Sequence, residues 1–341
     1  MKNRLEDHSL NRIIFFVFFL CLSVVWGGSL KKGNDTMRQG KIPVIYDSDI
    51  GDDIDDTWAL GFLLQCPRVD VKLVVGDQGK PLYRARLFAK FLEFTGHADV
   101  PIGIGIGDRN SDMGPQAEWI EDYELDRYPG IIYQDGVQAI IDTILQAEEP
   151  ITLLCVGPLP NIAEALRREP TIARKARFVG MQGSIRLGYG GSPEISDEYN
   201  VRADVKACQK VFAAGWPVTI TPLDTCGLVQ LEGRRYAKVK ESLHPVARAI
   251  LENYRIWSQD KDAPNTHSST LFDTVAVYLT FSETFCVMET LNIRVDDQGY
   301  TRIDPSGNSL HTAVSWKDMD SFKDLLVHRI TGGYSGSSRL P

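Results

Sequence analysis

The chain has 341 residues, enough for one large domain or two smaller ones, and its hydrophobic (43%) and charged (24%) fractions are ordinary for a globular protein. A formal net charge of −8 and the lack of a long basic run argue against a surface that binds nucleic-acid phosphates. The six cysteines include no C-x-x-C pair, which argues against a structural zinc site.

The N-terminus has the layout of a secretory signal peptide. Three basic residues precede the apolar run 13–25, and small residues follow at 27–29. The run is short for a membrane-spanning helix, so we expect no stable membrane insertion after cleavage. We therefore predict a signal peptide over residues 1–29, a linker over 30–40, a folded domain over 41–333 and a flexible tail over 334–341. This organisation predicts export to the periplasm or the extracellular space, with an uncleaved membrane anchor as the alternative.

An acidic loop is the most informative feature of the chain. Six aspartates lie between residues 47 and 56, between a predicted strand (41–46) and a predicted helix (57–64). In open α/β sheets, ligands bind at such strand ends. Crowded carboxylates repel one another unless a cation neutralises them, and Ca²⁺ or Mg²⁺ prefers such oxygen ligands. The alternative is a solvated loop in which one or two aspartates cap the helix.

Strand and helix patterns alternate along the rest of the chain. The predicted elements are a strand over 69–75, helices over 83–94 and 136–146, a strand over 151–156, a β-rich region over 286–314 and a helix over 318–330. The acidic, aromatic segment 111–133 is typical of a long surface loop or lid. The alternation predicts the α/β class: an open, mostly parallel sheet with helices on both faces and a Rossmann-like core.

Three known patterns can be compared with the acidic loop. An EF-hand needs Glu at loop position 12, which counted from Asp47 is Trp58. Asp47 after a strand also resembles the nucleophile of haloacid-dehalogenase-type phosphatases, although Gly51 stands where that family has Thr or Val. The loop is most similar to the N-terminal signature of the inosine–uridine-preferring nucleoside hydrolases, Asp-x-Asp-Pro-Gly-x-Asp-Asp. Here the loop is two residues longer, and Ile50 replaces the proline.

Three further blocks resemble the same family, in the same order. Residues 151–166 resemble its central Gly-x-Leu-Thr-Asn-Ile-Ala motif, 181–204 its Met-Gly-Gly and Glu-Phe-Asn-x-x-Ala-Asp segments, and 271–279 its His-Asp-x-x-Ala-Val segment. The resemblance spans roughly residues 41–330, so it implies that residues 41–333 form a catalytic domain with the nucleoside hydrolase fold.

The resemblance also implies roles for individual residues. It implies a Ca²⁺ ion held by the Asp49, Asp56 and Asp273 carboxylates and the Val156 carbonyl, with Asp49 also serving as the base that activates water. Substrate contacts are assigned to Asp55 (with Asp53 as the alternative for the ribose), Asp77, Glu198 and Asn200, and Trp257 is a candidate for stacking on the base.

One departure from the family pattern concerns the leaving group. Phe272 stands where many members have the histidine that helps to protonate the leaving base. His267 lies five residues upstream and has a suitable solution pKa, so it is the candidate acid. Otherwise the leaving group needs no proton, or catalysis is lost.

The sequence thus predicts calcium-dependent hydrolysis of the N-glycosidic bond of ribonucleosides or related N-ribosides, giving ribose and free base. The expected partner is a small-molecule nucleoside, and a homodimer or homotetramer is compatible with the family. Two alternatives remain open: a phosphatase that uses Asp47, and a non-catalytic ribosyl-binding protein.

Overall fold

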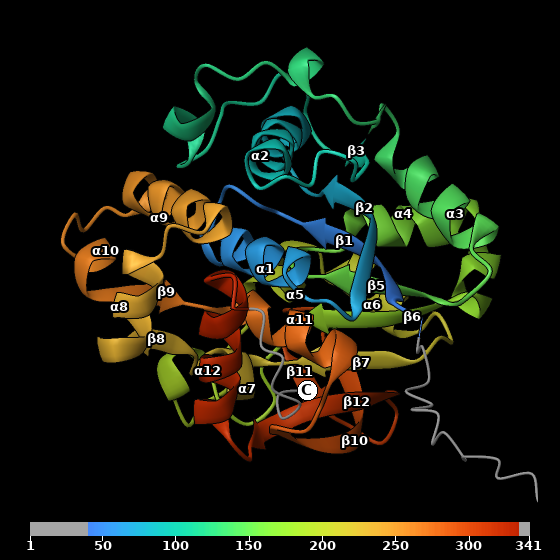
Figure 1. Cartoon of the computed structure of the whole chain (residues 1–341). Coiled ribbons are helices and arrows are strands. Elements are labelled where there is room, and N and C mark those ends of the chain that lie inside the picture. Colours follow the sequence, from blue (N-terminus) through green and yellow to red (C-terminus); the bar gives the residue numbers. More distant parts are fainter. Residues whose placement is uncertain (1–39, 334–341) are drawn as a thin grey trace, which may run out of the picture. The chain divides into compact units, whose positions relative to one another are not determined.

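The computed structural model describes residues 40–333, which contain one large central sheet with helices on both sides (Figure 1). The predicted signal peptide, almost all of the predicted linker, and the predicted tail lie outside these residues. The strands of the large sheet are β1 (Ile42–Ser48), β2 (Val69–Gly76), β3 (Ile102–Ile104), β4 (Ile132–Tyr133), β5 (Ile151–Cys155), β6 (Ala176–Met181), β7 (Val218–Thr221), β10 (Cys286–Val295), β11 (Thr301–Ile303) and β12 (Asn308–Trp316).

The spatial order of the strands is β11-β10-β12-β7-β6-β5-β1-β2-β3-β4. From β12 to β4 all neighbours pair in parallel, whereas β10 runs antiparallel to both β11 and β12. The predicted open, mostly parallel α/β sheet is therefore confirmed. A separate antiparallel pair consists of β8 (Gln230–Glu232) and β9 (His267–Thr270).

The α-helices agree closely with the sequence patterns, and the helix predicted over 136–146 has those same bounds. They are α1 (Asp55–Leu64), α2 (Pro81–Phe94), α3 (Gly136–Gln146), α4 (Pro160–Arg168), α5 (Tyr199–Ala203), α6 (Val205–Phe212), α7 (Leu223–Cys226), α8 (Gly233–Glu241), α9 (Pro245–Trp257), α10 (Ala263–Thr266), α11 (Phe272–Phe281) and α12 (Met319–Ile330). Short 3-10 helices cover Ala117–Ile120, Leu125–Arg127, Pro170–Arg174 and Tyr189–Gly191.

The sheet separates two hydrophobic cores, because successive side chains of a strand point to opposite faces. In β1, Val44 and Tyr46 pack with α1, α2, α9, α11 and α12, whereas Ile45 packs with α3, α4 and α6 on the other face. Central strands buried on both faces read as continuous apolar runs, which is why their sequences lack alternation.

The segment predicted as a surface loop or lid is a largely exposed, irregular segment that three aromatic side chains anchor to the domain. Trp119, Tyr123 and Tyr128 are buried among the residues of α2 and its neighbours. Two basic side chains of α2 donate hydrogen bonds to backbone carbonyls of this irregular segment. Arg86 donates to the Tyr123 carbonyl at 2.8 Å, and Lys90 donates to the Trp119 carbonyl at 2.5 Å. These contacts fix the segment as part of the structural framework.

Within residues 40–333, no helix combines the length and apolar character that a membrane crossing requires. The five cysteines in this part of the chain are all buried free thiols.

Candidate active site

The acidic loop lies at the point where the direction of chain winding changes. β1 has β5 on one side and β2 on the other, and the loops that follow β1 and β5 leave the same edge of the sheet. In doubly wound sheets this topological switch point is where ligands bind. Asp49 follows β1, while Val156 and Gly157 follow β5, so the fold itself brings these segments together.

A buried arginine holds the acidic loop in shape. Arg84 of α2 donates to the carbonyls of Asp49 and, at 2.9 Å, of Ile50, and it forms a 2.7 Å ion pair with Asp52. Gly51 adopts a φ of +107°, and a Cβ there would collide with Tyr83. The loop conformation therefore depends on glycine at position 51 and on the charged side chain of Arg84. Sequence patterns alone did not single out Arg84. The signal that could have found it is a basic residue on the apolar side of a predicted helix.

A cavity of about 360 Å³ opens beside this loop. Its walls combine carboxylates with an amide and four aromatic rings. The lining residues are Asp49, Asp52, Asp53, Asp55, Asp56, Val156, Met181, Tyr189, Glu198, Tyr199, Asn200, Trp257, Phe272 and Asp273. The structure thus brings together most of the residues that the sequence proposed, from four separate blocks of the chain.

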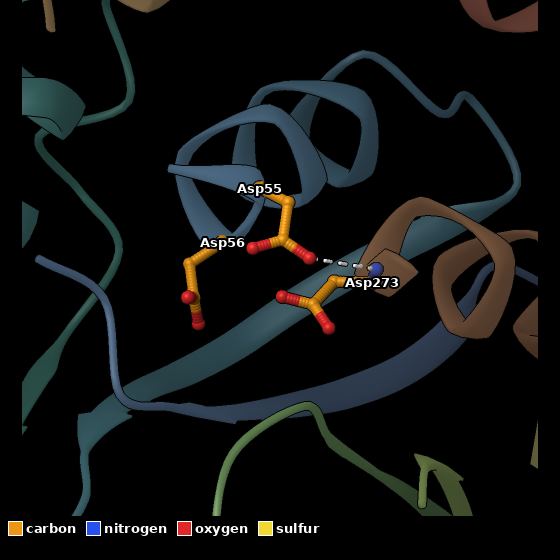
Figure 2. A group of neighbouring side chains, drawn as sticks. All are labelled: Asp55, Asp56 and Asp273. Carbon is orange, nitrogen blue, oxygen red and sulfur yellow. Dashed lines mark hydrogen bonds between the residues drawn. The ribbon is translucent and has the colours of Figure 1, made fainter. Parts of the chain in front are cut away.

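Three carboxylates form the tightest group in the cavity (Figure 2). Asp55 and Asp56 are the first two residues of α1, and Asp273 lies in the first turn of α11; one oxygen of each lies within 4.8 Å of the others. The Asp273 backbone N–H donates to Asp55 at 3.3 Å, and the Ser48 hydroxyl donates to Asp56 at 2.5 Å. The group therefore contains Asp55, which the sequence assigned to ribose, while Asp49 lines the same cavity nearby.

The three carboxylates are unstable as bare anions. Burial, and then repulsion from neighbouring carboxylates, raises the pKa of Asp55, Asp56 and Asp273 well above the usual range. Ligand oxygens of one charge, buried and clustered, match what a hard divalent cation needs, so the residues present fit a metal ion.

Two further carboxylates lie behind the cavity wall. Asp47 is fully buried and accepts a hydrogen bond from the Asn161 side chain at 2.8 Å, and Asp77 is also fully buried. Neither lines the cavity. The structure therefore does not place Asp77 among the lining residues, and its predicted substrate contact stays a prediction; both of its carboxylate oxygens are buried without a hydrogen-bond partner among the described residues.

Gly157 packs against the carboxylates of Asp77 and Asp49. A Cβ at this position would lie 2.5 Å from Asp77 Oδ2 and 2.7 Å from Asp49 Oδ1, both well inside normal contact. The glycine is therefore a condition for the position of Asp49.

We expect Gly157→Ala to displace the Asp49 carboxylate and to lower kcat by about 10²-fold, the usual effect of misplacing a reacting group by about 1 Å. Steady-state kinetics would measure the loss, and a thermal melt would show whether the fold survives. Gly40→Ala is the matched control, because its Cβ would meet only ordinary contacts at 3.9 Å or beyond. Wild-type kcat in Gly157→Ala would contradict this account.

Glu198 and Asn200 line the same cavity as the acidic group. Glu198 caps α5 and accepts the backbone N–H groups of Gly183, Asn200 and Val201, while burial raises its pKa to about 7. Asn200 Nδ2 donates to the Val156 carbonyl at 2.9 Å and to the Met181 carbonyl at 3.0 Å. With both amide hydrogens engaged, Asn200 Oδ1 remains available to accept a hydrogen bond from a ligand.

Aromatic rings form the remainder of the wall. Trp257 lines the cavity as expected, and its indole N–H donates to the Asp52 carbonyl at 3.0 Å. Tyr189 packs edge-on against Phe272, with ring centroids 6.2 Å apart. Tyr189 and Tyr199 were not proposed from the sequence. Only the Glu-Tyr-Asn segment gave a signal for Tyr199, and nothing local marked Tyr189.

His267 does not line the cavity. It begins β9, and its Nδ1 lies 2.7 Å from the Thr266 hydroxyl. The extended residues between it and α11 carry it away from Phe272, since a strand rises about 3.3 Å per residue. The structure therefore places His267 outside the cavity lining, and its role as the acid stays a prediction that this geometry does not support.

A doubly wound sheet whose switch-point cavity combines carboxylates, an amide and flat rings is compatible with a hydrolase of N-glycosidic bonds. The sequence model of the family described as inosine-uridine preferring nucleoside hydrolase matches residues 44–323. The chain belongs to this family, and the predicted family resemblance is confirmed.

Individual relatives agree with this assignment. The chain is 26% identical over 311 residues to the pyrimidine-specific ribonucleoside hydrolase RihA of Enterobacter sp. (strain 638), covering 85% of this chain and 97% of that protein. Among solved structures, it resembles a plant nucleoside hydrolase, the PpNRh1 enzyme (TM-score 0.73, 20% identity, 85% of this chain and 99% of that one). It also resembles the purine-preferring ribonucleoside hydrolase from Gardnerella vaginalis (TM-score 0.70, 22% identity, 85% and 98%).

Proposed function

We propose that this enzyme is a calcium-dependent hydrolase that cleaves the N-glycosidic bond of ribonucleosides and releases ribose and free base. The observation that carries the proposal is the shared cavity, in which Asp49 and the group Asp55, Asp56 and Asp273 face the hydrogen-bonding wall of Glu198 and Asn200. The names of the relatives, one specific for pyrimidine and one preferring purine ribonucleosides, support ribonucleosides as the substrate class.

Asp49 is the proposed base. Burial raises its pKa to about 6, so its carboxylate is ionised at neutral pH and still basic enough to take a proton from an attacking water. Neighbouring carboxylates stabilise the positive charge that develops on the ribosyl carbon as the bond to the base breaks. A bound calcium ion would lower the pKa of a bound water and polarise the ribose hydroxyls. Its ligands would be Asp56, Asp273, the Val156 carbonyl and either Asp49 or Asp55.

Asn200 is proposed to bind ribose through Oδ1. We expect Asn200→Ala to weaken transition-state binding of ribonucleosides by about 1–3 kcal/mol more than that of 2′-deoxyribonucleosides, if its partner is the 2′-hydroxyl. The measurement is the ratio of kcat/KM for ribonucleosides to kcat/KM for 2′-deoxyribonucleosides. The substitution also removes the hydrogen bonds to the Val156 and Met181 carbonyls, but that loss affects both substrates alike and cancels in the ratio. Equal losses on both substrates would place the contact elsewhere.

The direct test of the proposed function is ribose release over a panel of inosine, uridine, adenosine and cytidine. Activity should disappear with a chelator and return when calcium is restored. Release of inorganic phosphate from nucleotides would instead favour the phosphatase alternative, but Asp47 is buried and bonded to Asn161, which opposes a nucleophilic role. Ribose binding without turnover would favour a non-catalytic protein.

Export and assembly complete the proposal. The predicted signal peptide supports a periplasmic or extracellular location, which cell fractionation of the full chain and of a chain lacking residues 1–29 would test. The proposed homo-oligomer, a dimer or tetramer, would be tested by light scattering of the purified protein.

A further inference from the structure

The departing base needs a partner that Phe272 does not supply. When the glycosidic bond breaks, the electron pair stays on the base nitrogen, and an unprotonated purine or pyrimidine is a poor leaving group in an apolar environment. Phe272 has no proton to give, and His267 lies outside the cavity. The question is therefore which lining group carries an uncommitted proton.

The hydrogen-bond donors that line the cavity differ in whether an acceptor within the protein already uses their hydrogen. The Trp257 indole N–H is used by the Asp52 carbonyl, and the Asn200 amide is used by two backbone carbonyls. Among the described lining residues, the hydroxyl hydrogens of Tyr189 and Tyr199 have no acceptor in the protein. Among the lining groups other than carboxyls, the choice is therefore between these two phenols.

Position favours Tyr189. Its ring packs edge-on against Phe272 with an interplanar angle of 81°, so it stands beside the position that the histidine occupies in other members of the family. Its hydroxyl oxygen accepts the Tyr199 backbone N–H at 3.0 Å, which fixes the oxygen and leaves the hydrogen free. The Tyr199 ring instead lies beneath the Arg202 guanidinium, 6.0 Å from the ring centroid.

The environment of Tyr189 keeps its hydroxyl protonated. Burial and the nearby Glu198 raise the pKa of its phenol above the usual value, so the hydroxyl carries its proton throughout the working range of a neutral-pH enzyme and gives it up only to a strongly basic leaving nitrogen. Accepting a hydrogen bond from Tyr199 strengthens the hydroxyl as a donor.

We propose that Tyr189 is the general acid that protonates the leaving base, a role that rests on the proposed nucleosidase function. The bond from the ribosyl carbon to the base nitrogen breaks with its electron pair on the base, and the water oxygen bonds to that carbon. One water proton passes to Asp49, and the Tyr189 hydroxyl proton passes to the base. Solvent then takes the proton from Asp49 and returns one to the phenolate, so the balance is nucleoside plus water giving ribose plus base.

The test compares Tyr189→Phe with wild type on two kinds of substrate. Inosine and uridine need a proton on the leaving group, whereas p-nitrophenyl riboside does not. We expect Tyr189→Phe, which keeps the packing on Phe272, to lower kcat on the nucleosides by about 10²–10⁴-fold and on p-nitrophenyl riboside by less than about threefold. Tyr133→Phe, which removes an exposed phenol outside the cavity, is the control and should match wild type.

Each other result overturns the assignment. Equal losses on both substrates would make Tyr189 a positioning residue that acts through the Tyr199 backbone, and unchanged rates on both would leave it without a role in the reaction. If Tyr199→Phe gave the substrate-dependent loss instead, Tyr199 would be the acid. A wild-type enzyme that cleaves p-nitrophenyl riboside establishes the hydrolase independently of Tyr189, whereas wild-type inactivity on both substrates would overturn the proposed function and the acid with it.

Discussion

Replacing Asp49 with Asn should lower kcat on ribonucleosides by about 10²–10⁴-fold, the scale of losing a general base. The amide keeps the size of the carboxylate and an oxygen, so Arg84, which contacts the Asp49 backbone carbonyl, should still hold the loop. What disappears is the ability to take a proton. KM should change much less than kcat, because water activation is needed in the transition state rather than in substrate binding.

The pH profile gives a second readout for Asp49. Burial raises the pKa of Asp49 to about 6 in the metal-free protein, and a bound cation would lower it, so the wild-type kcat/KM should rise with pH at or below that value as the carboxylate loses its proton, and then level off. In Asp49→Asn this rise should vanish. Asp142→Asn, on the exposed face of α3, serves as the control. A variant that keeps the wild-type rise would assign the base to another group.

The sequence was sufficient for the sheet and for the position of the acidic loop, although it assigned Asp49 rather than Asp55 to the group with Asp56 and Asp273. Central strands such as β5 are short apolar runs bounded by turns, and the aspartates that follow β1 mark a strand end, so both signals are local. The placement of Asp273 beside Asp55 also follows, because the family resemblance assigns both of their sequence blocks to one site.

The sequence was insufficient where contacts are long-range. Segment 111–133 is polar and aperiodic, and its attachment to the domain involves Arg86 and Lys90 of α2, which donate to its carbonyls. Tyr189 comes from a 3-10 turn whose local sequence has no regular pattern, and only the folded chain puts it against Phe272. Asp77 has the local sequence of any other acid at a strand end, and only the folded chain shows that its carboxylate is buried beside the distant Gly157.

The metal-free enzyme should lose stability as the pH rises. The pKa values of Asp55, Asp56 and Asp273 are raised by folding, so the folded state keeps protons that the unfolded chain releases near pH 4. Wherever the folded state binds more protons, the free energy of unfolding falls as pH increases. Asp49, with a pKa of about 6, adds to the same trend between pH 4 and pH 6.

Calcium should reverse this loss by taking the place of the protons. At a calcium concentration of about 100 times Kd, binding adds about 2.7 kcal/mol to the free energy of unfolding. Thermal melts at pH 5 and pH 8, each with chelator or calcium, would measure the effect, and we expect the calcium-dependent rise in Tm to be larger at pH 8. Magnesium at the same concentration separates the two hard cations, because it demands a more regular shell of ligands.

Asp56→Asn should remove both the calcium-dependent rise in Tm and the contribution of Asp56 to the loss of stability at high pH. The amide oxygen can still accept the Ser48 hydroxyl that now bonds Asp56 at 2.5 Å, so the start of α1 should persist. With one carboxylate fewer, the repulsion among the remaining acids falls, and the metal-free variant should be more stable than metal-free wild type at pH 8. Elemental analysis should find no bound calcium, and activity should fall to background. Asp70→Asn, which affects only a surface ion pair with Lys72, is the control. Full retention of calcium by Asp56→Asn, with an unchanged rise in Tm, would mean that the cation binds elsewhere.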